Sequence, residues 1–397
     1  MLIKDGCRMK FQCDHCKSIL NSDSVTDGMR VDCPVCCAEI VCHPFAGQSK
    51  CDGIPHGDAP KPDAGARMNS RQERPSECNG KNSEFLNLFS GVFSKHSSCE
   101  MESCFAIGTE KSTPNIQDVD PVPRPWIFAR LMAVSLGLYL VLLFVWETWE
   151  NATLLPALMI VGSFAIPIPT LILFWELNAR RNVSIYAVTK MALVGGIVSF
   201  FITHLLIYVV PLTSIILPDW GELLGASVAG PLEETAKVLA MVFFVRTTKY
   251  QYKMNGLLFG AAVGTGFAAF ESAGYAFNFL AEGDVNDMLA VIGLRGVLSP
   301  FMHVVWSAIA GCALWQVLNG REFKWREWRL LCDEKFIRSF LVPVVLHMLW
   351  NSDLQLPYCG TQIVIGFVAW RACFKCIREG LHEISIEHAA ARNGDEP

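Results

Sequence analysis

Long apolar runs dominate the chain from Trp126 onward, and they limit it to a fold that lies in a lipid bilayer. Most of these runs approach the ~20 residues that an α-helix needs to cross the hydrocarbon core. Eight of them follow one another, at about 127–146, 154–175, 187–210, 226–245, 256–280, 290–317, 337–351 and 361–377. The sequence therefore predicts an all-α membrane protein with about eight transmembrane helices.

Composition supports this class and excludes others. The chain is 52% hydrophobic and only 18% charged, whereas an ordinary soluble domain has about 45–50% apolar and about 25% charged residues. Its formal net charge of −5 provides no basic surplus for a nucleic acid. The partners expected are therefore the lipid bilayer and membrane proteins, with no nucleic acid among them.

Cysteines are concentrated in the polar segment before the apolar runs. Two Cys-x-x-Cys pairs, with 16 residues between them, have the spacing of a zinc site in which two turns close a tetrahedron of thiolates. Strand-like pieces at 9–12 and 38–41 flank them. We predict a zinc ribbon over 1–45 with a structural zinc ion and a structural or partner-binding role. Its expected ligands are Cys13, Cys16, Cys33 and Cys36, and the neighbours that compete with them are Cys7, Cys37, Cys42 and His43.

The rest of the chain divides by composition. Residues 46–122 are rich in Gly, Pro, Ser and charged residues without a period, which predicts a flexible linker. Residues 123–380 form the predicted membrane domain, and 381–397 a cytoplasmic tail. No apolar run of signal-peptide length occurs in the first 30 residues.

The connections between the apolar runs sort by charge. Basic residues concentrate in every second connection, namely 176–186, 246–255 and 318–338. Three of the alternate connections contain no Lys or Arg, namely 147–153, 211–225 and 351–360. Under the positive-inside rule, both termini then lie in the cytoplasm. Thiols stay reduced in that compartment, which agrees with zinc binding.

Ionisable residues inside a span cost about 2.5–3.5 kcal/mol each on insertion, so each one is a candidate for function. The fourth run contains Pro231-Leu-Glu-Glu-Thr-Ala-Lys237. Glu233 and Lys237 are one turn apart, which predicts an ion pair between them. Glu234 points about 100° around the helix and is left without that local partner. A second carboxylate exceeds what a structural pair needs and indicates function.

Three further runs place polar groups at a similar depth. The fifth contains Glu271, the sixth His303, and the seventh His347 with Asn351 four residues later. Counting the helical rise from the span ends places these groups in the outer half of the bilayer. We therefore expect them to meet Glu233 in one pocket. Four-residue spacing of Gly256, Gly260 and Gly264 gives the fifth run a smooth face for the close packing that such a pocket requires. His204 is interpreted as a packing residue.

This set of side chains suits hydrolysis of an amide bond. A buried glutamate can act as a general base, and His and Asn side chains can donate hydrogen bonds to an oxyanion. No Ser, Cys or Thr stands out as an activated nucleophile, so water is the expected attacking group.

These residues resemble the PrsW family of intramembrane proteases, which is distantly similar to the CAAX prenyl endopeptidases. The EExxK motif corresponds to Glu233–Lys237 and the FxxxE motif to Phe267–Glu271; the histidine motifs correspond to His303-Val-Val-Trp306 and His347-Met-Leu-Trp-Asn351. The CAAX relatives have His in place of Glu271, which favours PrsW. The resemblance covers roughly 125–380.

The resemblance implies a bacterial inner-membrane protease with a role in signalling. The known type of substrate in the PrsW family is a membrane-anchored anti-sigma factor, cut on the extracytoplasmic side. Glu233 is then the base that activates water, Glu271 helps to hold the water, and Glu234 orients the pair. His347 and Asn351 stabilise the oxyanion, and the role of His303 is left open.

Three alternatives compete with this interpretation. A metalloprotease can be built from the same residues, since two His and a Glu can bind zinc; the lack of a His-Glu-x-x-His helix favours hydrolysis without a metal. A transporter or sensor can use intramembrane carboxylates to relay protons or bind an ion. The last alternative is an inactive scaffold that signals through the zinc ribbon.

Overall fold

The computed structural model describes residues 9–12, 19–22, 30–32, 39–41, 89–92, 94, 96, 105–109, 111–209, 229–244, 249–352 and 356–393. The chain forms two compact units. One comprises Met1–Lys81 with Lys95–Cys104, and the other comprises Asn82–Ser94 with Phe105–Pro397.

The first unit contains two antiparallel strand pairs. Strand β1 (Met9–Gln12) pairs with β2 (Ile19–Ser22), and β3 (Arg30–Asp32) pairs with β4 (Glu39–Val41). Strands β1 and β4 coincide with the two strand-like pieces expected from the sequence. In the sequence, each Cys-x-x-Cys pair falls between two strands that pair with each other. The four cysteines themselves lie outside the described residues, so the zinc ribbon stays a prediction.

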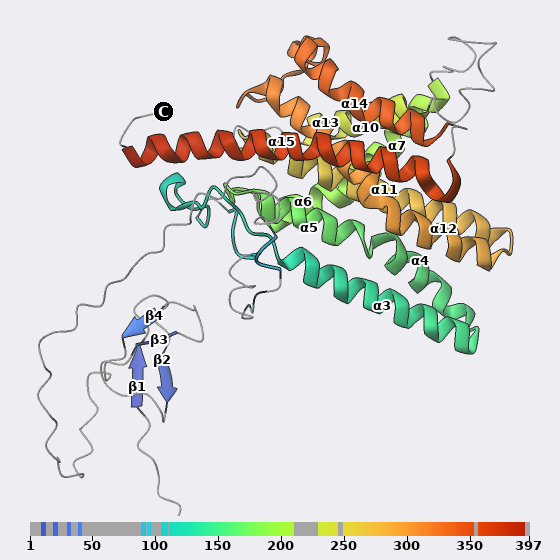
Figure 1. Ribbon diagram of the computed structural model, residues 1–397, viewed down its shortest axis with the longest axis horizontal. Helices are drawn as coiled ribbons and strands as arrows, with labels where there is room; N and C mark the ends of the chain where they lie inside the picture. The colour runs from blue at the N-terminus through green and yellow to red at the C-terminus, as the bar shows by residue number, and fades with distance from the viewer. Residues whose placement is uncertain are drawn as a thin grey trace, which may run out of the picture. The chain divides into compact units, whose positions relative to one another are not determined.

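The second unit is helical (Figure 1). Its helices before the 210–228 gap are η1 (Ile116–Asp118), α3 (Ile127–Trp149), η2 (Ala152–Leu154), α4 (Leu155–Phe164), α5 (Pro167–Leu177), α6 (Ile185–Lys190), the π-helical turn η3 (Met191–Gly195) and α7 (Gly196–Val209). After the gap follow α10 (Ala229–Phe244), α11 (Lys253–Ala281), α12 (Val285–Leu298), η5 (Ser299–Phe301), α13 (His303–Leu318), η6 (Trp325–Cys332), α14 (Glu334–Trp350), η7 (Pro357–Cys359) and α15 (Gly360–Asn393).

Helices occupy all eight predicted apolar runs, and the chain is an integral membrane protein. Within the described residues, six helical segments are long and apolar enough to cross a bilayer: Ile127–Trp149, Ala152–Leu177, Ile185–Val209, Lys253–Ala281, Val285–Leu318 and Gly360–Asn393. Helices α10 and α14, in the fourth and seventh runs, have 16 and 17 described residues and fall below that length. The number of spans and their orientation stay predictions.

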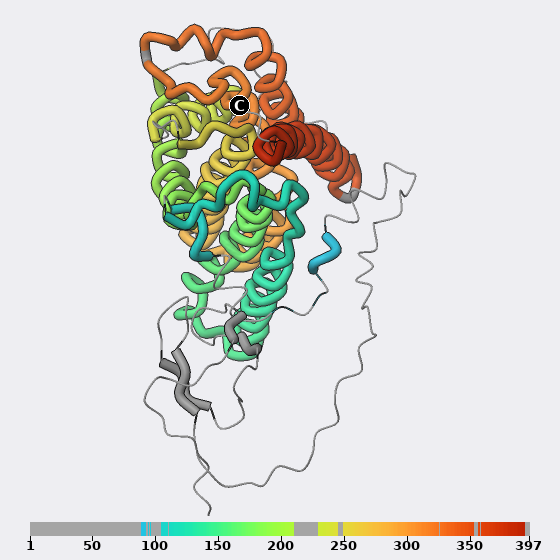
Figure 2. Tube along the Cα trace, turned by 90° about the vertical axis from the view of Figure 1, so that its left-hand side faces the viewer, coloured from blue at the N-terminus to red at the C-terminus, as the bar shows by residue number. Residues whose placement is uncertain are grey.

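Helix α11 lies at the centre of this unit, with α13, α12, α7, α5 and α4 packed around it (Figures 1 and 2). The close packing expected of its glycines is confirmed. A Cβ atom at Gly256, Gly260 or Gly264 would meet a backbone carbonyl oxygen of α13. The oxygens belong to Gly311, Ser307 and His303, respectively, so α13 runs antiparallel to α11 at backbone contact distance.

The sixth predicted run is not one continuous α-helix, and this corrects the sequence prediction. Helix α12 ends at Leu298, a 3₁₀ turn follows, and α13 begins at His303. Pro300 lies in that turn, and its ring removes a backbone donor and clashes with a continuing α-helix. The break makes His303 the first residue of α13.

Residues from the predicted linker contact the helical unit. Phe105 stacks on Trp175 with ring centroids 5.2 Å apart, and Arg180 donates a hydrogen bond to the Pro114 carbonyl oxygen. At the start of α3, the Glu176 carboxylate accepts hydrogen bonds from the backbone N–H groups of Trp126, Ile127 and Phe128. This carboxylate satisfies donors that a helix N-terminus otherwise leaves without partners.

Candidate active site

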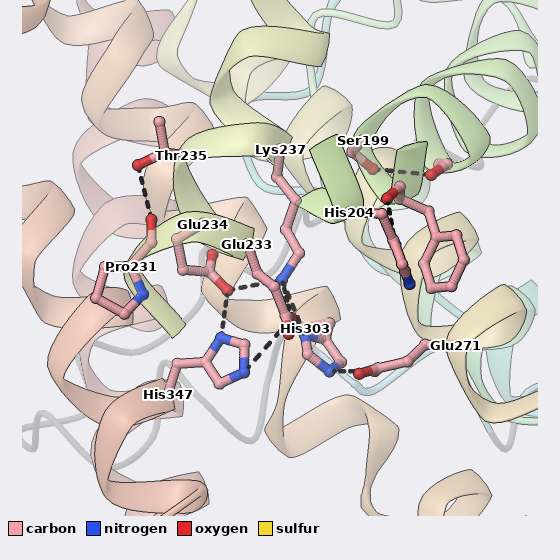
Figure 3. Close-up of polar contacts among 12 residues, drawn as sticks. Ser199, His204, Pro231, Glu233, Glu234, Thr235, Lys237, Glu271, His303 and His347 are labelled. Atoms are coloured by element: carbon pink, nitrogen blue, oxygen red, sulfur yellow. Dashed lines mark hydrogen bonds and ion pairs between the residues drawn. The ribbon is translucent and has the colours of Figure 1, made fainter. Parts of the chain in front are cut away.

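Six ionisable side chains from four helices meet inside the helical unit, and we call them the carboxylate–histidine cluster (Figure 3). Its members are Glu233, Glu234 and Lys237 of α10, Glu271 of α11, His303 of α13 and His347 of α14. Five of the six site residues predicted from the sequence are therefore brought together. His204 of α7 lies apart from them, with its Nδ1 atom 2.9 Å from the Phe200 carbonyl oxygen (Figure 3).

Lys237 connects two sides of the cluster. Its Nζ atom donates to Glu234 Oε1 at 2.7 Å and lies 2.9 Å from His303 Nδ1. The ammonium group also lies 4.2 Å from the centre of the Phe267 ring, a favourable contact with the negative face of the π system. Its side chain has no exposed surface.

The predicted local ion pair between Glu233 and Lys237 is present, but the expectation that Glu234 lacks this local partner is wrong. Glu234, three residues before Lys237, holds the ammonium group at 2.7 Å, whereas Glu233 is 3.8 Å away. Residues three and four apart both lie on one helix face, so contacts with other helices decide between them. His347 favours Glu234 as the nearer partner of Lys237, because its Nδ1 lies 3.0 Å from the same Glu234 oxygen that Lys237 binds.

Glu233 presents a buried oxygen towards both imidazoles. Its Oε2 atom lies 3.5 Å from His347 Nε2 and 4.0 Å from His303 Nδ1. Among the described residues, no hydrogen bond to this oxygen is formed. A buried acceptor without a hydrogen bond is costly, and a water molecule, a substrate group or a cation at this point would satisfy it.

Glu271 is held from two sides. His303 Nε2 lies 2.9 Å from Glu271 Oε2, and the Arg295 guanidinium of α12 pairs with the same oxygen. Sequence reasoning missed Arg295 as a member of the site. The signal was present, since Arg295 falls inside the apolar run 290–317, where an ionisable residue is as costly as Glu271 is in its own run.

Two other residues of the histidine motifs lie beside the cluster. Trp306 is completely buried, and its ring packs against the rings of His303 and His347, with centroids 5.4 and 4.7 Å away. Asn351 follows α14, and its backbone N–H donates to the His347 carbonyl oxygen at 3.1 Å. The proposed role of Asn351 at an oxyanion stays a prediction.

The cluster also contains a possible metal site. One ligand atom from each of Glu233, His303 and His347 lies within 4.8 Å of the other two. Two imidazoles and a carboxylate are a ligand set used by catalytic zinc, and the unsatisfied Glu233 oxygen is a donor atom available for it. These residues therefore fit a metal ion in type and spacing, although the ion would compete with Lys237 for His303 Nδ1.

Fold and site together define a multispanning membrane protein with a buried cluster of carboxylates and imidazoles. Residues 183–374 match the PrsW-protease family, described as PrsW family intramembrane metalloprotease. No curated protein and no solved structure matches the chain. The matched range includes every cluster residue, and the match supports intramembrane proteolysis as the general activity.

Proposed function

We propose that the chain is an intramembrane endopeptidase in which Glu233 activates water to cut a peptide bond of a membrane-anchored protein. The observation that carries this proposal is the buried Glu233 Oε2 atom, which has no hydrogen bond and lies 3.5 Å from His347 Nε2. A water molecule at this point is within reach of a proton acceptor and an imidazole. Side chains from four helices fix the arrangement, which is what preorganised catalysis requires.

The proposed reaction follows from these positions. Glu233 Oε2 takes a proton from water as the water oxygen attacks the scissile carbonyl carbon. Negative charge then develops on the carbonyl oxygen, which His347 and Asn351 are proposed to stabilise. When the C–N bond breaks, the proton held by Glu233 moves to the departing amine nitrogen. Glu234 supports this step indirectly, since it binds both Lys237 and His347.

A metal-dependent form of the same peptidase is the second candidate. The family description and the three-residue group are the two observations that support it. Glu233, His303 and His347 would hold the ion, with Glu233 as a ligand instead of the free base. A bound metal supplies Lewis-acid polarisation and a more acidic water.

The substrate class follows from the family resemblance and the predicted topology. We propose a membrane-anchored, anti-sigma-factor-like protein, cut near the outer face of a bacterial inner membrane. The N-terminal zinc ribbon is proposed to bind a partner or stabilise the cytoplasmic segment.

Comparison of membrane-protein fragments in cells tests the activity. Wild type is compared with Glu233→Gln and His347→Ala, with His204→Ala as the control for an imidazole outside the cluster. We expect one or more membrane-anchored proteins to accumulate uncleaved in the two cluster variants and not in the control. Altered ion flux in Glu233→Gln, with every membrane protein processed as in wild type, would support the transporter alternative instead. Loss of cleavage with a chelator in a Cys13→Ser, Cys16→Ser background, which removes ligands of the proposed ribbon zinc, would select the metal-dependent form.

A further inference from the structure

Arg295 makes three contacts with one face of α11. Its guanidinium pairs with Glu271 Oε2, its Nε donates to Ser272 Oγ at 3.2 Å, and its Cζ lies 4.6 Å from the centre of the Tyr275 ring. A planar guanidinium held by a carboxylate, a hydroxyl and an aromatic ring has a fixed orientation. Arg295 can therefore fix the position of the carboxylate that it binds.

The oxygen that Arg295 holds is the oxygen that orients His303. Glu271 Oε2 lies 2.9 Å from His303 Nε2, so the N–H group at this nitrogen donates a hydrogen bond to the carboxylate. The other ring nitrogen, Nδ1, is then the acceptor, and it lies 2.9 Å from Lys237 Nζ. Partners of the second ring nitrogen set the tautomer of a histidine in this way.

We infer that Arg295 is a positioning residue of the proposed peptidase: it fixes Glu271, which in turn fixes the orientation and tautomer of His303. This inference rests on the proposed function. Helix α12 does not need the ion pair to pack, since Met288 and Ile292 already contact Ala276, Leu155 and Leu158 in a buried apolar cluster. Arg295 also compensates a carboxylate whose side chain is only 14% exposed.

The inference is tested by the kinetics of purified variants. Their substrate is a protein identified by the comparison of membrane-protein fragments. We expect Arg295→Met to lower kcat by 10–100-fold, the usual range when a supporting partner of a site histidine is removed, with KM changed less than about threefold. Arg295→Lys, which keeps the charge and loses the planar guanidinium, should recover part of the rate. Arg338→Met, which removes an arginine from an exposed pair with Glu334, should cleave as wild type does.

A double-mutant cycle separates positioning from a purely structural pair. If Arg295 acts through Glu271, then Arg295→Met should lower kcat no further in a Glu271→Gln background. Full additivity, or a wild-type kcat in Arg295→Met, would overturn the inference. If Glu233→Gln also cleaves at the wild-type rate, the proposed function fails instead.

A spectroscopic measurement decides the inference without any substrate. In ¹⁵N-histidine NMR spectra of the full chain, with His303→Gln used for assignment, His303 should carry its proton on Nε2. Arg295→Met should shift this signal towards a mixture of tautomers, and Arg295→Lys should partly preserve it. An unchanged His303 signal in a folded Arg295→Met protein would overturn the inference.

Discussion

Lys237 balances the charge of the cluster at the scale of single residues. The described part of the site contains three carboxylates, Glu233, Glu234 and Glu271, and two basic side chains, Lys237 and Arg295. Counted with ionised carboxylates and neutral imidazoles, the cluster has one formal negative charge in excess. This single excess negative charge is consistent with a site that accepts a proton or a cation, and removing Lys237 would raise it to two.

We predict that Lys237→Met destabilises the protein by about 3–5 kcal/mol, the usual cost of removing one partner of a buried ion pair. Unfolding of detergent-solubilised protein measures this free energy. Lys253→Met is the matched control, because Lys253 lies 3.8 Å from Glu379 in a pair whose side chains are 26% and 41% exposed. Such a pair contributes about 0–1 kcal/mol. Equal stabilities of the two variants would contradict the prediction.

Sequence reasoning found the site residues that are costly in lipid and misjudged the contacts between them. Glu233, Glu271, His303 and His347 were identifiable because each is a polar group in an apolar run. The nearer partner of Lys237 was not identifiable, because Glu233 and Glu234 both lie within reach on its own helix. The choice depends on His347, which is more than a hundred residues away in the chain and contacts Glu234 only after folding.

At the scale of helices, glycine determines how near α11 comes to its neighbours. Gly264 faces the His303 carbonyl oxygen, so this contact brings the start of α13 to α11. The same helix carries Glu271 two turns later. Because backbone N–H groups at a helix start favour nearby negative charge, the break before His303 also places a favourable dipole beside the carboxylates.

We predict that Gly260→Ala destabilises the helical unit by about 1–3 kcal/mol, the usual cost of an overpacked contact, because the new Cβ would overlap the Ser307 carbonyl oxygen. Cleavage should fall in parallel, since α13 carries His303. Gly274→Ala on the same helix is the control, because its Cβ would have no atom within 4 Å. That change should be neutral or stabilise the helix by about 0.5–1 kcal/mol. Unfolding curves of the Gly260→Ala and Gly274→Ala proteins measure both changes in stability.

The glycine spacing was recognised in the sequence, whereas the break between α12 and α13 was missed. Periodicity identifies a face, and a stripe of three glycines indicates that a neighbour lies close. The three residues Ser299–Phe301 are too few to interrupt the hydropathy averaged over a membrane span, so one apolar run became one predicted helix. Pro300 was the available signal.

At the scale of the whole molecule, two separate metal sites are proposed, and metal content distinguishes them. If both bind, the purified full chain should contain two zinc-class ions. Ser substitutions at Cys13 and Cys16 should remove one, and His347→Ala the other, because each change deletes thiolate or imidazole ligands. Elemental analysis by mass spectrometry measures the ratio. Unchanged metal content in His347→Ala would rule out the metal-dependent form and leave the Glu233–water route.

Orientation in the membrane decides on which side the proposed cleavage occurs, and two native cysteines test it. Cys332 precedes α14 and Cys359 follows it, and both are exposed. The 17 residues of α14 span about 25 Å, close to the thickness of a bilayer core. The basic connection 318–338 is predicted to be cytoplasmic, so these cysteines should lie on opposite sides.

A membrane-impermeant maleimide, followed by peptide mass spectrometry, should label Cys359 in spheroplasts and Cys332 only in inverted vesicles. Cys312 and Cys373, which are buried, should remain unlabelled in both and report intact folding. Labelling of Cys332 from outside would reverse the predicted orientation. The cluster would then lie nearer the cytoplasmic face, and a substrate cut on the extracytoplasmic side would no longer be compatible with it.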